Sequence, residues 1–424
     1  MSTEQASREE MATNSARRYE NTLVGILFLS WGTVFLDRMS QLYLAPDIAR
    51  EFRLSHEQIG LLASVLAITW AVSGLLFGAV SDRFGRKRIL IPAVFAFSLL
   101  SWVSGAVHSF QQLLLVRALM GIAEGPTWSI MTALIEESSS PSRRGRNIGV
   151  VVSAAALVGL AVAPVLSTQV AARFGWRWAF FVAGIPGLFM GAVIWRFVQE
   201  PRRSSHEPAG HHEVKLADYF SLLRYRNIWL CCIAAAGFVS WLFLDNVFAP
   251  LYLTQVAHQA STTAGFFLGA TGLGSFFLGF LFPSLSDRWG RKPVLLLMAG
   301  MSAIVPMAFQ VSWFYSVPWL LAAVLFLANT GQGLAALIMV LVPTESVPSQ
   351  FAATSIGLAT FCGEIVGATV APVLAGTLAE RHGLGITLWL SAAGSLVIML
   401  STLFLKETAS ARKPATELQV VTAD

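Results

Sequence analysis

The residues best suited to chemistry are charged side chains inside apolar segments. They are Asp37, Arg38, Arg117, Glu124, Asp245 and Glu364. A charge near the centre of a bilayer costs about 2.5–3.5 kcal/mol, so each is a candidate functional residue. An arginine can hold a carboxylate through paired hydrogen bonds, and a carboxyl group in a medium of low dielectric can carry a proton. This set therefore favours the binding of an organic anion together with a proton.

The spacing of these residues predicts a common cavity. Asp37 and Arg38 lie a little past the middle of one apolar segment, and Arg117 and Glu124 lie in another. Seven residues return nearly to the same face of a helix, about 10 Å along its axis. Two segments would thus offer two cations and two carboxylates to one space. The alternative is two ion pairs that only tie the helices together.

The composition indicates that these segments cross a membrane. Of the 424 residues, 55% are hydrophobic and 12% are charged, whereas soluble domains carry about 25% charged residues. A transmembrane helix needs about 20 apolar residues. We predict an all-α membrane protein with twelve transmembrane helices, at about 22–45, 57–80, 89–109, 111–135, 146–172, 177–198, 227–253, 262–285, 293–313, 317–342, 351–379 and 384–405.

The predicted spans form two six-helix bundles, over 22–198 and 227–405. A central loop over 199–226 separates them, and it ends in a short amphipathic segment expected to lie on the membrane surface. Polar tails over 1–21 and 406–424 flank the bundles. The first tail lacks the pattern of a cleaved signal peptide.

Basic residues are distributed unequally between the two sides of the membrane. Most lie in the loops on the side of the two tails. The opposite side has only Arg50, Arg53, Arg173, Arg177 and Arg381. Because positively charged loops stay in the cytoplasm, we predict a multi-pass protein of the cell (inner, cytoplasmic) membrane, with both termini and the central loop cytoplasmic.

The two halves repeat one another. SDRFGRK (81–87) recurs as SDRWGRK (286–292), and VAPVL (162–166) recurs as VAPVL (370–374). Since each half has six spans, the repeat keeps its orientation, as in transporters whose two bundles rock around a site near the midplane. Pro164 and Pro372 occupy matching places and are expected to bend the fifth and eleventh spans.

The loop GAVSDRFGRK (78–87) resembles the G-x-x-x-D-R-x-G-R-K motif of the major facilitator superfamily, and the resemblance covers nearly the whole chain. The second copy departs from the motif at its first position, where Pro283 replaces glycine. In that superfamily such loops form charge contacts that hold a cytoplasmic gate. The resemblance gives this role to Asp82, Arg83, Arg86, Asp287, Arg288 and Arg291. The alternative is a basic loop that only sets the orientation in the membrane.

The first half is also similar to the anion:cation symporter branch of that superfamily, through FLDR (35–38) and RALMGIAEGP (117–126). That branch includes carriers of sugar acids, sialic acid and aromatic carboxylates. Its two arginines serve the anion, and its first-span acid and fourth-span glutamate serve proton coupling. By resemblance, Arg38 and Arg117 bind substrate, and Asp37 and Glu124 carry protons.

Aromatic residues replace hydroxyl groups of that branch. Phe35 stands where a tyrosine is frequent, and Trp70 with SGLLFG stands where a tyrosine and a Q-x-P-G-G-like run are frequent. A polyhydroxylated sugar acid is therefore less expected. Together with Trp128 and Trp241, these residues favour a flatter, more apolar anion, with an aromatic carboxylate as the expected example.

The second half has fewer charges at the matching positions. Asp245, Asn246 and Gln332 match Asp37, Arg38 and Glu124. Three amides are therefore expected to hydrogen-bond the substrate from the second bundle: Asn246, Asn329 and Gln332. Asp245 and Glu364 are candidates for further proton sites, and the alternative pairs Asp245 with Arg38 across the bundles.

We expect proton-coupled symport (uptake) of a small organic anion by alternating access. A proton-coupled exporter or antiporter of drugs or metabolites on the same fold is the first alternative, and a membrane sensor or scaffold is the second. No P-loop, nucleophile elbow or H-E-x-x-H motif is present, so we expect no enzyme, no catalytic residue and no cofactor.

The expected partners are the anion, protons and membrane lipid, with no nucleic acid, and the chain is expected to function as a monomer. The three cysteines lie in apolar segments without metal-ligand spacing, so no metal site is expected.

Overall fold

The computed structural model describes residues 3–140, 142–200, 222, 224–348 and 351–409, and the described residues form helices joined by short turns. Eleven helices are long and apolar enough to cross a membrane. α5 (Phe110–Ser138) has 29 residues and packs among them, but it includes the charged Arg117 and Glu124. The predicted all-α membrane fold is confirmed. Most of the central loop and of the C-terminal tail lies outside the described residues.

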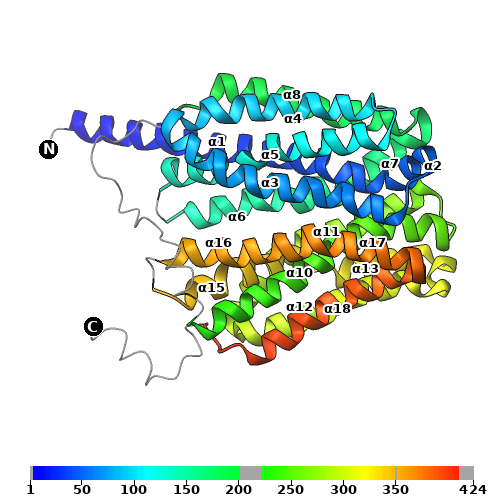
Figure 1. Cartoon of the computed structure of the whole chain (residues 1–424). Coiled ribbons are helices and arrows are strands. Elements are labelled where there is room, and N and C mark those ends of the chain that lie inside the picture. The colour runs from blue at the N-terminus through cyan, green and yellow to red at the C-terminus, as the bar shows by residue number, and fades with distance from the viewer. Residues whose placement is uncertain (1–2, 141, 201–221, 223, 349–350, 410–424) are drawn as a thin grey trace.

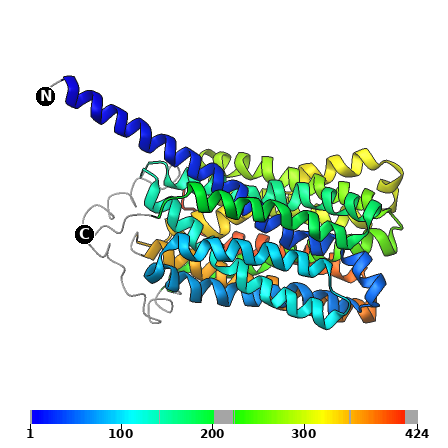
Figure 2. The same ribbon diagram turned by 90° about the horizontal axis from the view of Figure 1, so that it is seen from above.

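The first bundle consists of six membrane-crossing stretches and one short helix. Its elements are α1 (Thr3–Tyr43), α2 (Ala45–Phe52), α3 (His56–Phe84), α4 (Arg86–Gly105), α5, α6 (Arg144–Ala154), η1 (Ala155–Val162), α7 (Ala163–Phe174) and α8 (Trp176–Phe197). α6, η1 and α7 run on as one stretch, and η1 is a π-helix. Figure 2 shows the start of α1 projecting beyond the bundle.

The second bundle has the same plan. Its elements are α10 (Arg226–Leu251), η2 (Tyr252–Val256), α11 (Ser261–Trp289), α12 (Arg291–Gln310), η3 (Ser312–Ser316), α13 (Pro318–Ala328), α14 (Gly331–Ala335), η4 (Ala336–Leu341), α15 (Val342–Glu345), α16 (Ala352–Gly363), η6 (Glu364–Val370), α17 (Ala371–His382) and α18 (Gly385–Phe404). The two bundles lie side by side (Figure 1). We call the end where α1 begins and α18 ends the termini end, and the opposite end the far end.

The repeat seen in the sequence extends to the backbone and to two glutamates. Gly85 and Gly290 both have positive φ, at 105° and 95°, and both separate a pair of helices at the termini end. Glu200 accepts hydrogen bonds from the first two backbone N–H groups of α4, and Glu407 does the same for α12. A carboxylate at a helix N-terminus satisfies donors that the helix leaves unpaired.

The matching prolines follow matching π-helical stretches. η1 ends just before Pro164 in α7, and η6 ends just before Pro372 in α17. Proline has no N–H and its ring crowds the carbonyl one turn earlier, so the helix before it must adjust. π-helical turns often occur at functional sites, and η6 begins with the buried-span carboxylate Glu364.

The bundles touch closely at the far end through small residues. A β-carbon added to Gly376 of α17 would lie 2.5 Å from the carbonyl oxygen of His56, and one on Gly60 of α3 would overlap the carbonyl of Pro372. α11 and α7 meet in the same way, because a β-carbon on Gly265 would lie 2.7 Å from the carbonyl oxygen of Pro164. Small residues allow helices to approach closely in lipid.

Polar contacts join the bundles near the same end. The backbone N–H of His56 donates to Glu380 of α17 at 2.5 Å. Nearer the middle, the hydroxyl of Tyr43 donates to the side-chain oxygen of Asn246 at 2.8 Å. The far end is therefore closed in this conformation.

The arginines of the repeated loops pair within their own bundles. Arg86 binds Glu137 of α5 at 2.6 Å, and Arg291 binds Glu345 of α15 at 2.7 Å. Arg291 also pairs with the exposed Asp287. The side chain of Asp82 lies outside the described part of the structure. The cytoplasmic-gate role of these loops stays a prediction.

Replacing Gly376 with valine is expected to separate the far ends, because the new side chain would meet a backbone carbonyl that cannot move aside. Spin labels on the exposed residues Arg50 and Arg381, in a variant without the three native cysteines, would report a longer distance. Gly357→Val is the matched control, since nothing lies within 4 Å of a β-carbon there. Equal distances in both variants would contradict this packing.

Candidate functional site

Arg38 is the cation that lies between the bundles. It projects from α1, is only 5% exposed, and makes no hydrogen bond within the described structure; its Nη2 atom is buried without a partner. Three aromatic rings surround the guanidinium. Their centroids lie 5.8, 5.2 and 5.5 Å from its Cζ, for Phe35, Trp70 and Phe243 respectively. Phe243 belongs to α10, so both bundles contribute to this aromatic enclosure.

Glu124 brings a carboxyl group to the same region from α5. It is fully buried, and neither carboxyl oxygen has a hydrogen-bond partner among the described residues. Among the cations, Arg38 has the strongest electrostatic effect on this carboxyl group, and Arg117 has a weaker one. A carboxyl group without hydrogen bonds in such a place is well suited to change its protonation state, because its charged form lacks stabilising donors.

Arg117 lies deeper than Arg38, inside the first bundle. It is completely buried, donates to Ser104 at 3.2 Å and to the sulfur of Met120 at 3.3 Å, and lies 5.1 Å from the ring of Phe180. Its electrostatic partners are two carboxyl groups, Asp37 and Glu124. In this conformation Arg117 supports the carboxylates and does not face the space between the bundles.

Asp37 belongs to this buried set. Its side chain is fully buried and accepts a hydrogen bond from Ser101 of α4, while its other oxygen has no partner. The structure therefore brings the four predicted charges of the first bundle together, as the spacing implied, but it divides them. Arg38 lies at the bundle interface, whereas Asp37, Arg117 and Glu124 form a buried layer behind it.

The predicted aromatic residues fall into two groups. Phe35 and Trp128 both contact Trp31, with ring centroids 5.0 and 4.9 Å from it, beside the Arg38 enclosure. Trp241 is instead packed inside the second bundle, where its indole N–H donates to the carbonyl of Ser302 at 3.0 Å.

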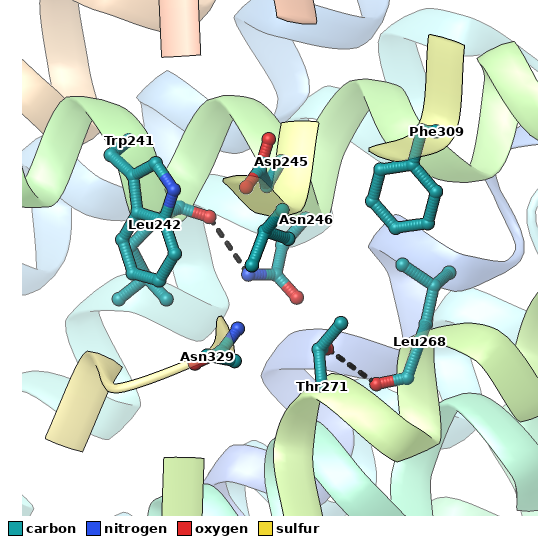
Figure 3. A pocket seen from close by; sticks show the side chains of 9 residues that line it. Trp241, Leu242, Asp245, Asn246, Leu268, Thr271, Phe309 and Asn329 are labelled. Carbon is teal, nitrogen blue, oxygen red and sulfur yellow. Dashed lines mark hydrogen bonds between the residues drawn. The ribbon is translucent and has the colours of Figure 1, made fainter. Parts of the chain in front are cut away.

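The second bundle contains a small pocket near the break between α13 and α14 (Figure 3). Asn329 lies at the break, and its side-chain oxygen accepts from the N–H of Gly331 at 3.1 Å. Asn246 points toward the centre of this view, and its amide donates to the carbonyl of Leu242. Gln332 binds Ser275 through its backbone N–H. The pocket is lined by Trp241, Leu242, Asp245, Asn246, Leu268, Thr271, Val305, Phe309 and Asn329.

The two carboxylates of the second bundle have different surroundings. Asp245 is buried, and neither of its carboxyl oxygens has a hydrogen-bond partner among the described residues. Glu364, the first residue of η6, interacts electrostatically with Arg38. Within the described residues neither carboxylate forms an ion pair with Arg38, so the alternative pairing of Asp245 with Arg38 is not observed.

Three residues of the site carried little signal in the sequence. Tyr43 and Trp31 look like ordinary apolar-span aromatics, and Ser101 looks like a small packing residue. Tyr43 lies on the helix of Arg38, but a spacing of five residues does not return to the same helix face, and only its contact with Asn246 identifies it. Ser101 is identified only by the helix that packs beside α1.

Replacing Arg117 with methionine is expected to destabilise the protein strongly, by about 3–5 kcal/mol, because two buried carboxyl groups would lose their cation. Thermal unfolding of the purified protein measures the effect. The double variant Arg117→Met/Asp37→Asn should recover part of the loss, and Arg173→Met, at an exposed arginine of the far end, is the control. If Arg117→Met unfolds at the temperature of this control, the supporting role is wrong.

Comparison with known proteins gives concordant results. The sequence profile of the Major Facilitator Superfamily matches residues 27–370. The probable 4-methylmuconolactone transporter of Cupriavidus pinatubonensis is 31% identical over 67% of this chain and 67% of its own length. The cis,cis-muconate transport protein of Acinetobacter baylyi is 29% identical over 88% of this chain and 91% of its own length. The probable L-galactonate transporter of Escherichia coli is 29% identical over 61% of this chain and 60% of its length.

Two solved structures share the fold. A bacterial homolog of the human lysosomal transporter Spinster, in an inward-facing and unoccupied conformation, has a TM-score of 0.68 at 20% identity and covers 91% of this chain and 95% of its own. The nucleoside transporter NupG has a TM-score of 0.75 at 13% identity and covers 90% and 99%. With two six-helix bundles, a repeated loop and this profile match, the chain belongs to the major facilitator superfamily.

Proposed function

We propose that the protein is a secondary active transporter that couples the inward movement of protons to the uptake of a small organic carboxylate. The observation that carries this proposal is Arg38, a cation enclosed by rings from both bundles and free of hydrogen bonds to the described protein groups. A buried guanidinium without partners is costly. A bound carboxylate would remove that cost through two parallel hydrogen bonds.

The relatives support a carboxylate as the common chemical group. Muconate, galactonate and hexuronate, named in three of them, each carry one or more carboxylates. Betaine and proline, named in another set, carry one as well. These compounds differ widely in hydroxyl content, so the shared carboxylate is the group that one arginine at the midplane would recognise.

The aromatic enclosure favours an unsaturated or aromatic carboxylate over a sugar acid. Trp70 and Phe35 present flat apolar faces beside the guanidinium. Planar π-systems stack on such faces with a gain of about 0.5–1.5 kcal/mol beyond burial alone. A sugar acid would place several hydroxyl groups against the rings and leave them without hydrogen bonds.

The distribution of basic residues gives the orientation in the membrane. If the termini end is cytoplasmic, as the positive-inside rule requires, the closed far end is extracellular. Alternating access then consists of opening the contacts of α3 with α17 and of α7 with α11, while the termini end closes. We propose a location in the inner (cytoplasmic) membrane, with one chain as the transporting unit.

Glu124 couples the proton to the anion in this mechanism. When Glu124 is ionised, its charge competes for Arg38. Protonation from outside neutralises it and leaves Arg38 free to bind the carboxylate. Binding then compensates the guanidinium, so the loaded cavity can close and reopen inward. One proton with a monoanion is electroneutral, and each additional proton adds about 2.3 kcal/mol of driving force per 100 mV.

A proton-coupled exporter of anions on the same fold would use the same residues, and an exporter of cationic drugs would not need Arg38. The enclosure of a cation by rings from both bundles favours anions over cationic drugs, because a second cation would be repelled there.

Proton influx into proteoliposomes tests the proposal. Carboxylates are added one at a time: cis,cis-muconate, an aromatic acid, galactonate and a short monocarboxylate. We expect at least one to trigger influx in the wild type, with loss in Arg38→Ala and retention in Arg173→Ala. If no carboxylate triggers proton influx and cationic or neutral compounds cause proton movement instead, the protein is a drug exporter and the proposed uptake of carboxylates is wrong.

Glu124→Gln should separate coupling from binding. Glutamine resembles the neutral acid but cannot release a proton, so uptake driven by a pH gradient should fall to the level of empty vesicles. Exchange of labelled substrate at equal pH should continue, because Arg38 stays available. Normal gradient-driven accumulation in this variant would show that another residue carries the proton.

A further inference from the structure

Glu364 is a carboxyl group of the second bundle that the mechanism above does not use. It is the first residue of the π-helix η6, its side chain is half-buried, and its Oε2 atom is buried without a hydrogen-bond partner. Arg38 is the charged group that has an electrostatic effect on this carboxyl group. The two residues belong to different bundles and share neighbours at the interface, because η6 packs against α3 and α10, the helices whose Trp70 and Phe243 enclose Arg38.

The two groups make no direct polar contact. Arg38 and Glu364 form no ion pair within 4.0 Å and no hydrogen bond in the described structure, although each has a buried polar atom without a partner. Two opposite charges that remain apart in a region of low dielectric forgo a large attraction. A small group placed between them could satisfy both.

The helices that pack against η6 bring no other cation near Glu364. α3 has no titratable residue between Gln58 and Asp82, α16 has only Cys362, and the charges of α17 lie in its last turn at the far end. α10 contributes Asp245, whose carboxyl oxygens are buried without hydrogen-bond partners among the described residues. Arg38 and a ligand bound beside it therefore have the largest effect on the charge of Glu364.

We propose that Glu364 is the group of the second bundle that binds the substrate carboxylate, in its protonated form. This proposal rests on the proposed function. Arg38 would donate to the carboxylate from the first bundle, and the Glu364 O–H would donate to one of its oxygens from the second. Two carboxylates cannot both be ionised beside a single arginine without strong repulsion, so one of them must hold a proton.

The consequence is a direct link between loading and closure. A carboxylate held by Arg38 and Glu364 bridges the two bundles at the midplane. η6 continues into α17, whose Pro372 and Gly376 pack against α3 at the far end. Formation or loss of the hydrogen bond between Glu364 and the substrate would therefore affect α17, the helix that closes the far end.

The pH dependence of binding tests the proposal. Binding of cis,cis-muconate and of galactonate to the purified protein is measured by tryptophan fluorescence from mildly acidic to mildly alkaline pH. In the wild type the affinity should fall as the pH rises. Glu364→Gln places a permanent neutral donor at the site. The affinity of this variant should therefore fall less steeply with pH than that of the wild type, with a difference between the two slopes of up to about tenfold per pH unit. Glu364→Ala should bind more weakly at all pH values, because the donor is lost.

The controls separate the possible failures. Glu57→Gln, at an exposed glutamate of the far end, should keep the wild-type pH profile. If the wild type binds carboxylates and Glu364→Gln keeps that profile too, Glu364 does not take up the proton and the inference is wrong, while the proposed function stands. If the wild type binds no carboxylate at any pH, the proposed function itself fails.

Discussion

The proposed transport mechanism depends on one unsatisfied charge. Arg38 lies near the middle of the membrane-crossing bundle, enclosed by aromatic rings and without hydrogen bonds to described protein groups. Rings can attract a guanidinium by about 0.5–2 kcal/mol each, which is less than the cost of leaving it desolvated. The carboxyl groups on either side, Glu124 in one bundle and Glu364 in the other, are therefore in competition for a single cation.

That competition explains why the site spans two bundles. A carboxylate bound only by the first bundle would move with it and would give no preference for either conformation. Groups from α10 and η6 also face Arg38, so the state of the site changes when the bundles move. The far-end contacts through glycines leave no room for side chains, and interfaces packed so closely switch between discrete arrangements rather than deform gradually.

The fold could be predicted from the sequence, and so could the identity of the charged residues that the membrane-crossing helices contain. Charged residues in apolar segments are rare enough to be recognised one by one, and the repeat shows which half each belongs to. The loops that repeat in sequence also repeat in backbone geometry at Gly85 and Gly290. The division of roles could not be predicted, because it depends on the rotation of each helix about its own axis. Arg117 and Arg38 read alike in sequence, yet one is buried inside a bundle and the other lies between bundles. Glu364 begins the π-helical turn before Pro372 in the eleventh span, and it is the carboxylate of the second bundle on which Arg38 has an electrostatic effect.

In the proposed mechanism, anion binding and proton binding are linked at one site. Calorimetric titration of the purified wild-type protein with cis,cis-muconate, in two buffers of equal pH and different ionisation enthalpy, tests this most directly. We expect the heats to differ between the buffers, because protons are taken up from solution as the anion binds. Binding with identical heats in both buffers at several pH values would show that the anion binds without a proton, and it would contradict proton-coupled transport at this site.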